Sequence, residues 1–84
     1  MNLSNKIFVF EKARNKENGE VLERETRRKG HELMIQLLDI GKPLLYEYVS
    51  GGSLYTSRVT EYEFNEGELV VTTMNSVYTF NLKG

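Results

Sequence analysis

The chain has 84 residues, a formal net charge of −1, no cysteine and a single histidine. This length predicts one small domain over residues 1–84. The missing thiols exclude disulfides, thiol nucleophiles, iron–sulfur clusters and Cys-based zinc sites.

Catalytic residue combinations are scarce in this sequence. His31 and Asp39 are the single histidine and the single aspartate, and no suitable serine lies near them in the chain. A Ser-His-Asp triad or a His-rich metal site is therefore not expected. The glutamates of residues 61–68 fall on a hairpin expected to be exposed, whereas paired-carboxylate hydrolysis needs one carboxyl raised by burial. We expect no enzymatic activity, no metal site and no cofactor.

Residues 1–5 are mainly polar, and a run of only four apolar residues follows at 7–10. This pattern is too short for a signal peptide or a membrane-spanning helix. We expect a disordered tail over residues 1–5, a cytoplasmic location and no membrane partner.

The first regular element is a strand over residues 6–13, since Ile7-Phe8-Val9-Phe10 is β-branched and aromatic. Residues 15–19 follow with Asn and Gly, which accept the positive φ that turns need. A strand followed by such a turn predicts the first half of a β-hairpin.

Residues 20–29 fit two structures. As a helix, the segment forms three oppositely charged i,i+4 pairs, but only two of its residues are apolar, so it has no stripe to bury. As the return strand of a hairpin, it places Arg24 opposite Glu11, so that opposite charges face across the ladder. We favour the hairpin.

Residues 31–38 contain a short apolar run that predicts a two-turn helix, since Leu and Met are good helix formers. The expected inward residues are Leu33, Met34, Leu37 and Leu38. A strand is the alternative for so short a run. Gly41 and Pro43 end the element.

Residues 43–82 alternate between apolar and polar side chains and are interrupted only at 50–53, 65–67 and 75–76. This pattern predicts four antiparallel strands joined by tight turns. The expected fold is β-rich α+β: an N-terminal β-hairpin, one short helix, then a four-stranded antiparallel meander that forms a strongly bent sheet or a small open barrel.

The turn at residues 65–68 brings two polar motifs together, because facing residues then have numbers that sum to about 133. Thr60 faces Thr73, Arg58 faces Asn75, and Ser57 faces Ser76. Hydroxyls, an amide and one guanidinium at a tight turn suit a phosphate or a carboxylate. The candidate binding residues are Thr56, Ser57, Arg58, Thr73, Asn75 and Ser76. The alternative is an Asx-turn at Asn75 with hydroxyl pairs across the strands.

The motif Ile40-Gly41-Lys42-Pro43-Leu44 is followed by Thr56-Ser57-x-Val59 and by Thr73-x-Asn75-Ser76-x-Tyr78-x-Phe80. These motifs, spread over residues 38–82, resemble short uncharacterised proteins of Gram-positive bacteria and their phages. The resemblance implies a compact accessory protein and carries no activity to this chain.

A basic cluster is the second candidate surface. It consists of Arg24, Arg27, Arg28 and Lys29. Such a ribbon beside surface tyrosines suits a single nucleic-acid strand. Glutamates are interleaved with these cations, which favours a solvated, self-paired surface.

We expect a non-catalytic binding module of bacterial or phage origin that acts through protein–protein contacts, because exposed strand edges are open to pairing with another chain. The protein partner is unknown, and a homodimer through an edge strand is compatible with this expectation. The alternative is a nucleic-acid-binding accessory protein that uses the Arg24–Lys29 ribbon. A third interpretation is a small-ligand pocket at Ser57, Arg58 and Asn75.

Overall fold

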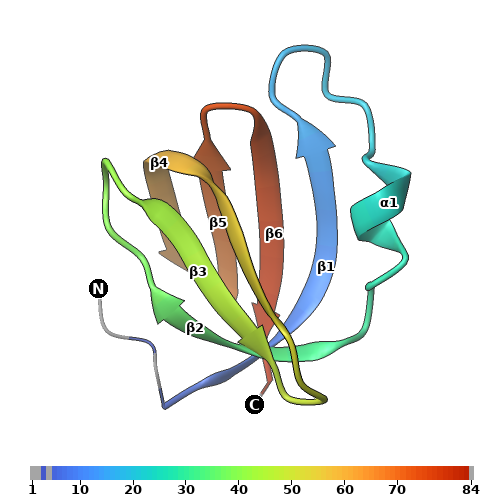
Figure 1. Ribbon diagram of the computed structural model, residues 1–84, viewed down its shortest axis with the longest axis vertical. Coiled ribbons are helices and arrows are strands. Elements are labelled where there is room, and N and C mark those ends of the chain that lie inside the picture. The colour runs from blue at the N-terminus through green and yellow to red at the C-terminus, as the bar shows by residue number, and fades with distance from the viewer. Residues whose placement is uncertain (1–2, 4, 84) are drawn as a thin grey trace.

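Six antiparallel strands close into a barrel (Figure 1). The computed structural model describes residues 3 and 5–83, without the side chains of residues 24 and 26. The elements in chain order are β1 (Ile7–Asn15), α1 (Glu23–Thr26), β2 (Glu32–Leu37), β3 (Pro43–Tyr48), β4 (Ser53–Asn65), β5 (Glu68–Thr73) and β6 (Ser76–Leu82). Each strand pairs with the next, and β6 pairs with β1 to close the sheet.

The predicted α+β class with a four-stranded open sheet is wrong, because the fold is all-β and all six strands belong to one closed barrel. The residues expected to form a helix form β2 instead. Leu33 and Ile35 point into the barrel, and the residues between and after them are more exposed. The six residues of β2 are too few for periodicity alone to separate helix from strand. These residues form a strand because they pair with β1 on one side and with β3 on the other.

The predicted N-terminal hairpin is also wrong, because β1 pairs along its length with β6. The expected return strand is reduced to one bridge, between Arg14 and Val21, and is followed by the single helical turn α1. The turn before it does form as the residues predict. The Asn15 side-chain Oδ1 accepts a 2.8 Å hydrogen bond from the Glu17 N–H, and Gly19 has a φ of 71°.

The last four strands begin and end within one residue of the alternating segments read from the sequence. The expected disordered tail falls largely on residues 1, 2 and 4, which lie outside the described residues. Leu3 is described, and it packs in the core with 5% of its surface exposed.

Aromatic rings fill the barrel at its centre. The rings of Phe10, Phe80, Tyr46 and Tyr48 meet in succession, edge to face, with centroids 5.7, 5.4 and 5.5 Å apart. Edge-to-face contacts at this spacing are the favoured arrangement for aromatic rings. This stack joins β1 and β6 on one side of the barrel to β3 on the other.

Closure of the barrel is uneven at β4. Residues 53–58 of this long strand pair with β3, and its ladder with β5 starts only at Val59. A bulge between Val59 and Glu61 marks the change of partner. The first half of β4 therefore has a strand on one side only. In Figure 1, β3 lies on one side of it, and β6, β1 and α1 follow in turn on the other.

The segment that contains α1 covers the second half of β1 in a similar way. Pairing between β1 and β2 is confined to residues 7–9 of β1. Beyond that point, the Phe10 N–H donates to His31 O at 2.9 Å, and the Leu22 N–H donates to Ala13 O at 2.9 Å. Residues 20–31 thus take the place of a strand beside β1. They face the half of β4 that has a strand on one side only.

Candidate binding cleft

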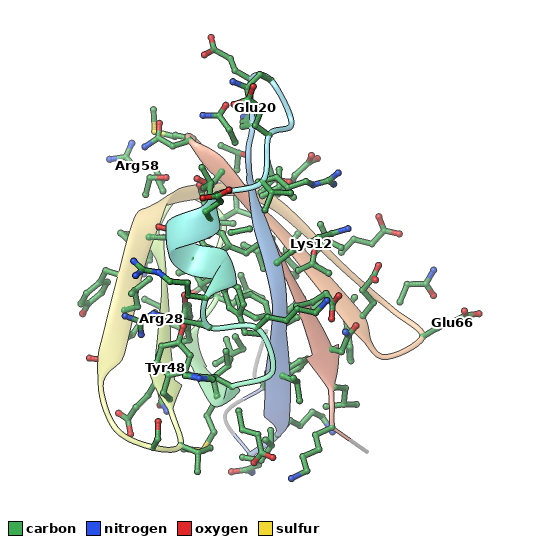
Figure 2. All side chains as sticks on the ribbon, turned by 90° about the vertical axis from the view of Figure 1, so that its right-hand side faces the viewer. Lys12, Glu20, Arg28, Tyr48, Arg58 and Glu66 are labelled. Atoms are coloured by element: carbon green, nitrogen blue, oxygen red, sulfur yellow. The ribbon has the colours of Figure 1, made fainter. Side chains whose placement is uncertain are left out.

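A cleft of about 730 Å³ lies between α1 and the first half of β4, and it is called here the α1–β4 cleft. Its walls come from α1 with the turn after it, from residues 54–57 of β4 and from the β5–β6 turn, and its base includes Tyr46 and Tyr78. Figure 2 shows α1 between β4 and β1, with Arg28 on the side of β4. The cleft brings together residues from both of the candidate surfaces predicted from the sequence.

The wall formed by the α1 turn is basic. Arg27 and Arg28 both line it, and neither guanidinium forms an ion pair with a described residue. The Arg28 Cζ atom lies 5.1 Å from the centroid of the Tyr48 ring, a cation–π contact that orients the side chain. The His31 ring also packs edge-on against the Tyr48 ring, with the ring centroids 5.9 Å apart. Glu25 is the single carboxylate in the lining, so the two arginines leave a net positive wall.

The base of the cleft is made of tyrosines. Burial is the main cause that raises the pKa of Tyr46 far above its ordinary value, and the neighbouring Tyr48 hydroxyl adds to the shift. Burial likewise raises the pKa of Tyr78, against a lowering effect of Ser76. The Tyr48 hydroxyl is itself buried and lies near that of Tyr46, but its geometry does not meet that of a hydrogen bond with any described residue. The hydroxyls of Tyr46 and Tyr78 stay protonated at neutral pH, so they act as neutral donors and acceptors.

Thr73, which has no exposed surface, organises the polar wall. Its Oγ1 accepts from the Ser57 hydroxyl at 2.8 Å and from the Ser76 N–H at 3.1 Å, and lies 3.2 Å from the Ser76 carbonyl oxygen. The Asn75 N–H is also directed at this oxygen, at 3.3 Å. A hydroxyl that faces several backbone groups of its own turn acts mainly as a local anchor. One of the two interpretations of this motif was that hydroxyls pair across the strands. The hydrogen bond between Ser57 and Thr73 is such a pair.

The predicted register at this end of the hairpin is wrong by one residue. Val59, and not Thr60, lies opposite Thr73, because Thr60 occupies the bulge. Arg58 is exposed and does not line the cleft, and Figure 2 shows it apart from Arg28. The structure thus brings five of the six predicted residues together and leaves Arg58 out.

Thr56 has a different task. Its Oγ1 accepts a 3.1 Å hydrogen bond from the Leu44 N–H and donates to Ser57 O at 2.7 Å. The ladder between β3 and β4 changes register at this point, between Pro43 and Leu45. The threonine hydroxyl therefore takes the place of a backbone carbonyl at the irregularity.

Among the described side chains, those predicted as a basic ribbon do not share one face. The backbone of Arg24 belongs to α1, and its side chain lies outside the described part of the structure. Arg27 and Arg28 line the cleft, whereas the Lys29 Nζ forms a 3.4 Å ion pair with Glu11 Oε1. The interleaved glutamates neutralise part of the ribbon, as the charge pattern indicates.

The unpaired backbone of β4 is a feature of the cleft that sequence reasoning did not locate. Tyr46 lies opposite Leu54, and the Tyr48 N–H donates to Gly52 O at 2.9 Å, so these residues form the hydrogen-bonded pairs of the ladder. Hydrogen-bonded and non-hydrogen-bonded pairs alternate in an antiparallel ladder. The backbone N–H and C=O groups of Ser53 and Tyr55 therefore face away from β3, and Tyr55 lines the cleft. The Tyr55 side chain is 68% exposed beside them.

The α1–β4 cleft combines several kinds of chemical group. It offers cations, neutral hydroxyls, an exposed ring and a row of backbone groups. Among the described residues, no cluster of three or more His, Asp or Glu side chains is placed to hold a metal ion.

No protein-family model, curated protein or solved structure matches this chain significantly.

Over the described residues, the structure contains no helix with the length and apolar character needed to cross a membrane.

Proposed function

We propose that the protein is a cytoplasmic, non-catalytic binding module of bacterial or phage origin, and that it contacts a protein partner through the α1–β4 cleft. The observation that carries this proposal is the placement of two arginines, without an ion-pair partner among the described residues, opposite a stretch of β4 that has a strand on one side only. About 730 Å³ of open cleft separates them. Cationic, aromatic and backbone groups together are the usual makings of a protein-recognition surface.

The internal use of the polar side chains argues against catalysis. The Ser57 hydroxyl donates to Thr73, and the Thr56 hydroxyl donates to Ser57 O, so neither is paired with a general base. A nucleophile needs a base within hydrogen-bond reach. The single histidine contacts the ring of Tyr48 and lies across the cleft from these hydroxyls.

A cleft-filling variant tests the proposal. Asn75 is exposed, lines the cleft and uses its backbone for the turn, so Asn75→Trp fills space at little cost to the fold. Gln36→Trp is the matched control, because Gln36 is exposed on β2 and lies outside the cleft. Both variants and the native protein are used as bait in lysate of the native host, with quantitative mass spectrometry of the captured proteins.

We expect a set of proteins that the native bait and Gln36→Trp capture and that Asn75→Trp loses. Capture that Asn75→Trp leaves unchanged would show that the contact surface lies elsewhere. Capture that disappears on nuclease treatment would favour the alternative function.

That alternative is nucleic-acid binding, for which Arg27, Arg28 and the exposed ring of Tyr55 are the relevant groups. It predicts binding of a single strand that weakens steeply with added salt, because cations displace counterions from phosphates. The net positive charge of the cleft is small, and Glu25 lies within it. We therefore rank this function second.

A further inference from the structure

We propose that the partner in the α1–β4 cleft is an extended, acidic peptide segment that pairs with residues 53–57 of β4 as an added strand. This inference rests on the proposed binding function of the cleft and specifies its occupant. Two independent observations support it, one in the backbone of β4 and one in the side chains opposite.

The backbone observation is the one-sided ladder of β4. Ser53 and Tyr55 lie opposite residues of β3 at non-hydrogen-bonded positions, so their N–H and C=O groups face away from β3, and Tyr55 lines the cleft. The β5 ladder begins only at Val59 and does not cover these groups. A row of donors and acceptors that repeats every second residue matches the backbone of an extended peptide. Residues 53–57 span roughly 17 Å at about 3.4 Å per residue, enough for a short added strand.

The side-chain observation is the charge of the opposite wall. Arg27 and Arg28 face β4 without a carboxylate partner among the described residues, and the contact with Tyr48 holds one of them in place. Glu25 offsets a single positive charge. An added strand would run between this wall and β4. Its side chains on the arginine side are therefore expected to include Asp or Glu, which accept the fork of guanidinium donors.

A peptide suits this cleft better than a nucleic-acid strand. Phosphates and bases do not offer alternating N–H and C=O groups, so they would leave the β4 edge unpaired. A strand from a second copy of this chain meets the same backbone requirement. It is weaker on charge, because the open edge of the second copy, residues 53–57, contains no carboxylate to face the arginines.

The first experiment selects binders from a phage-displayed library of random linear peptides, with the full-length protein as bait. We expect enriched sequences that contain Asp or Glu and lack Pro at alternate positions. Affinities of synthetic peptides are then measured by fluorescence anisotropy. Arg27→Glu with Arg28→Glu should weaken binding by tenfold or more. The control Arg14→Glu with Lys42→Glu changes the same net charge at exposed residues outside the cleft and should leave affinity unchanged.

The backbone pairing has its own variant. Proline at residue 55 removes an N–H that faces the cleft while the hydrogen bonds of Leu54 to β3 remain. Tyr55→Pro should weaken binding about tenfold beyond Tyr55→Ala, which loses the ring and keeps the donor. N-methylation of the peptide, one residue at a time, gives a test that does not depend on the stability of the variant. Losses should appear at every second position only.

Several outcomes overturn the inference. Peptides that require the cleft but show no alternation on N-methylation remove the added strand and leave the proposed function standing. Enriched peptides without acidic residues remove the charge argument. A library that yields no binder overturns the inference. Binders whose affinity Asn75→Trp does not change overturn the inference and also contradict the proposed function. A concentration-dependent dimer that Tyr55→Pro abolishes assigns the edge to a second copy.

Discussion

The side-chain hydroxyl of Ser57 donates a 2.8 Å hydrogen bond to that of Thr73, and this bond ties β4 to the β5–β6 turn. It lies where β4 leaves β3 and begins its ladder with β5. The same oxygen of Thr73 accepts from the backbone of the turn. The polar residues of the cleft therefore fix the bend of β4, and the bend in turn leaves the edge of its first half open.

Replacing Thr73 by valine removes this anchor at constant shape. The buried N–H of Ser76 and the hydroxyl of Ser57 then lose their acceptor, which costs about 1–3 kcal/mol in the free energy of unfolding. Urea denaturation followed by circular dichroism measures the difference. Thr72→Val is the matched control, because Thr72 is half-buried one residue away and its side-chain hydroxyl forms no hydrogen bond with the described residues. The Thr60 hydroxyl donates to the backbone carbonyl of Thr72, which the substitution keeps. Equal losses in the two variants would contradict the anchoring role.

The β4–β5 turn contains a conformation that its sequence does not favour. Glu66 has a φ of 51° and Gly67 a φ of 81°, the two positive angles of a type I′ hairpin turn, where Asn-Gly is preferred. We expect Glu66→Asn to stabilise the fold by about 1 kcal/mol, because asparagine accepts the left-handed region more readily. Thermal unfolding should show a midpoint roughly 4–8 °C higher for a domain of this size.

The control for that variant separates conformation from charge. Glu63, Glu66 and Glu68 lie around one shallow pocket, so loss of any one carboxylate reduces repulsion. Glu66→Gln removes the charge and keeps the unfavourable backbone angle. A midpoint for Glu66→Gln as high as that for Glu66→Asn would assign the gain to charge.

Local turn chemistry made the last four strands readable from the sequence. Gly51 and Gly67 stand at positive φ, where glycine is permitted and most residues are not, so the breaks between strands are visible in the residues themselves. The β2 segment has no such signal. Leu33 and Ile35 belong to a strand because β1 and β3 flank them, and that arrangement depends on the closing contact of β6 with β1.

The sequence predicted which polar residues meet at the candidate site better than it predicted how they are arranged. Counting from the turn placed Thr60 opposite Thr73 and Ser57 opposite Ser76, but the bulge at Thr60 shifts the register by one, and no glycine marks the bulge. The Ser57 hydroxyl bonds to Thr73 instead. The meeting of Arg27 and Arg28 with β4 could not be predicted, since it depends on barrel closure over most of the chain length. Alternation in residues 43–49 was the available signal for the buried tyrosines of β3.

The hydroxyl of Tyr48 is buried and has no hydrogen-bond partner among the described residues, so its removal should not weaken the fold. A buried polar atom without a partner loses its hydration and gains nothing in return. We expect Tyr48→Phe to leave the free energy of unfolding unchanged or to raise it by about 1 kcal/mol, since the ring contacts with Tyr46 and Arg28 remain. Chemical denaturation measures this. Tyr48→Leu is the control, and it should destabilise because it removes those contacts. A clear loss of stability in the phenylalanine variant would mean that the hydroxyl has a partner.

Alkaline pH should unfold this protein through its buried tyrosines. Burial raises the pKa values of Tyr46 and Tyr78 above the ordinary value of 10.0, so both stay protonated in the folded state while the unfolded chain loses these protons. Above about pH 10 the unfolded state thus binds fewer protons than the folded state, and stability falls as pH rises, by about 1.4 kcal/mol per pH unit for each hydroxyl. Below that pH, both contributions are fully present.

Denaturation midpoints measured over this range should fall steeply for the native protein and less steeply for Tyr46→Phe. The variant Tyr55→Phe alters an exposed ring and should keep the native slope. A stability that stays level above pH 10, or a Tyr46→Phe slope equal to the native one, would show that these hydroxyls are not held protonated by the core.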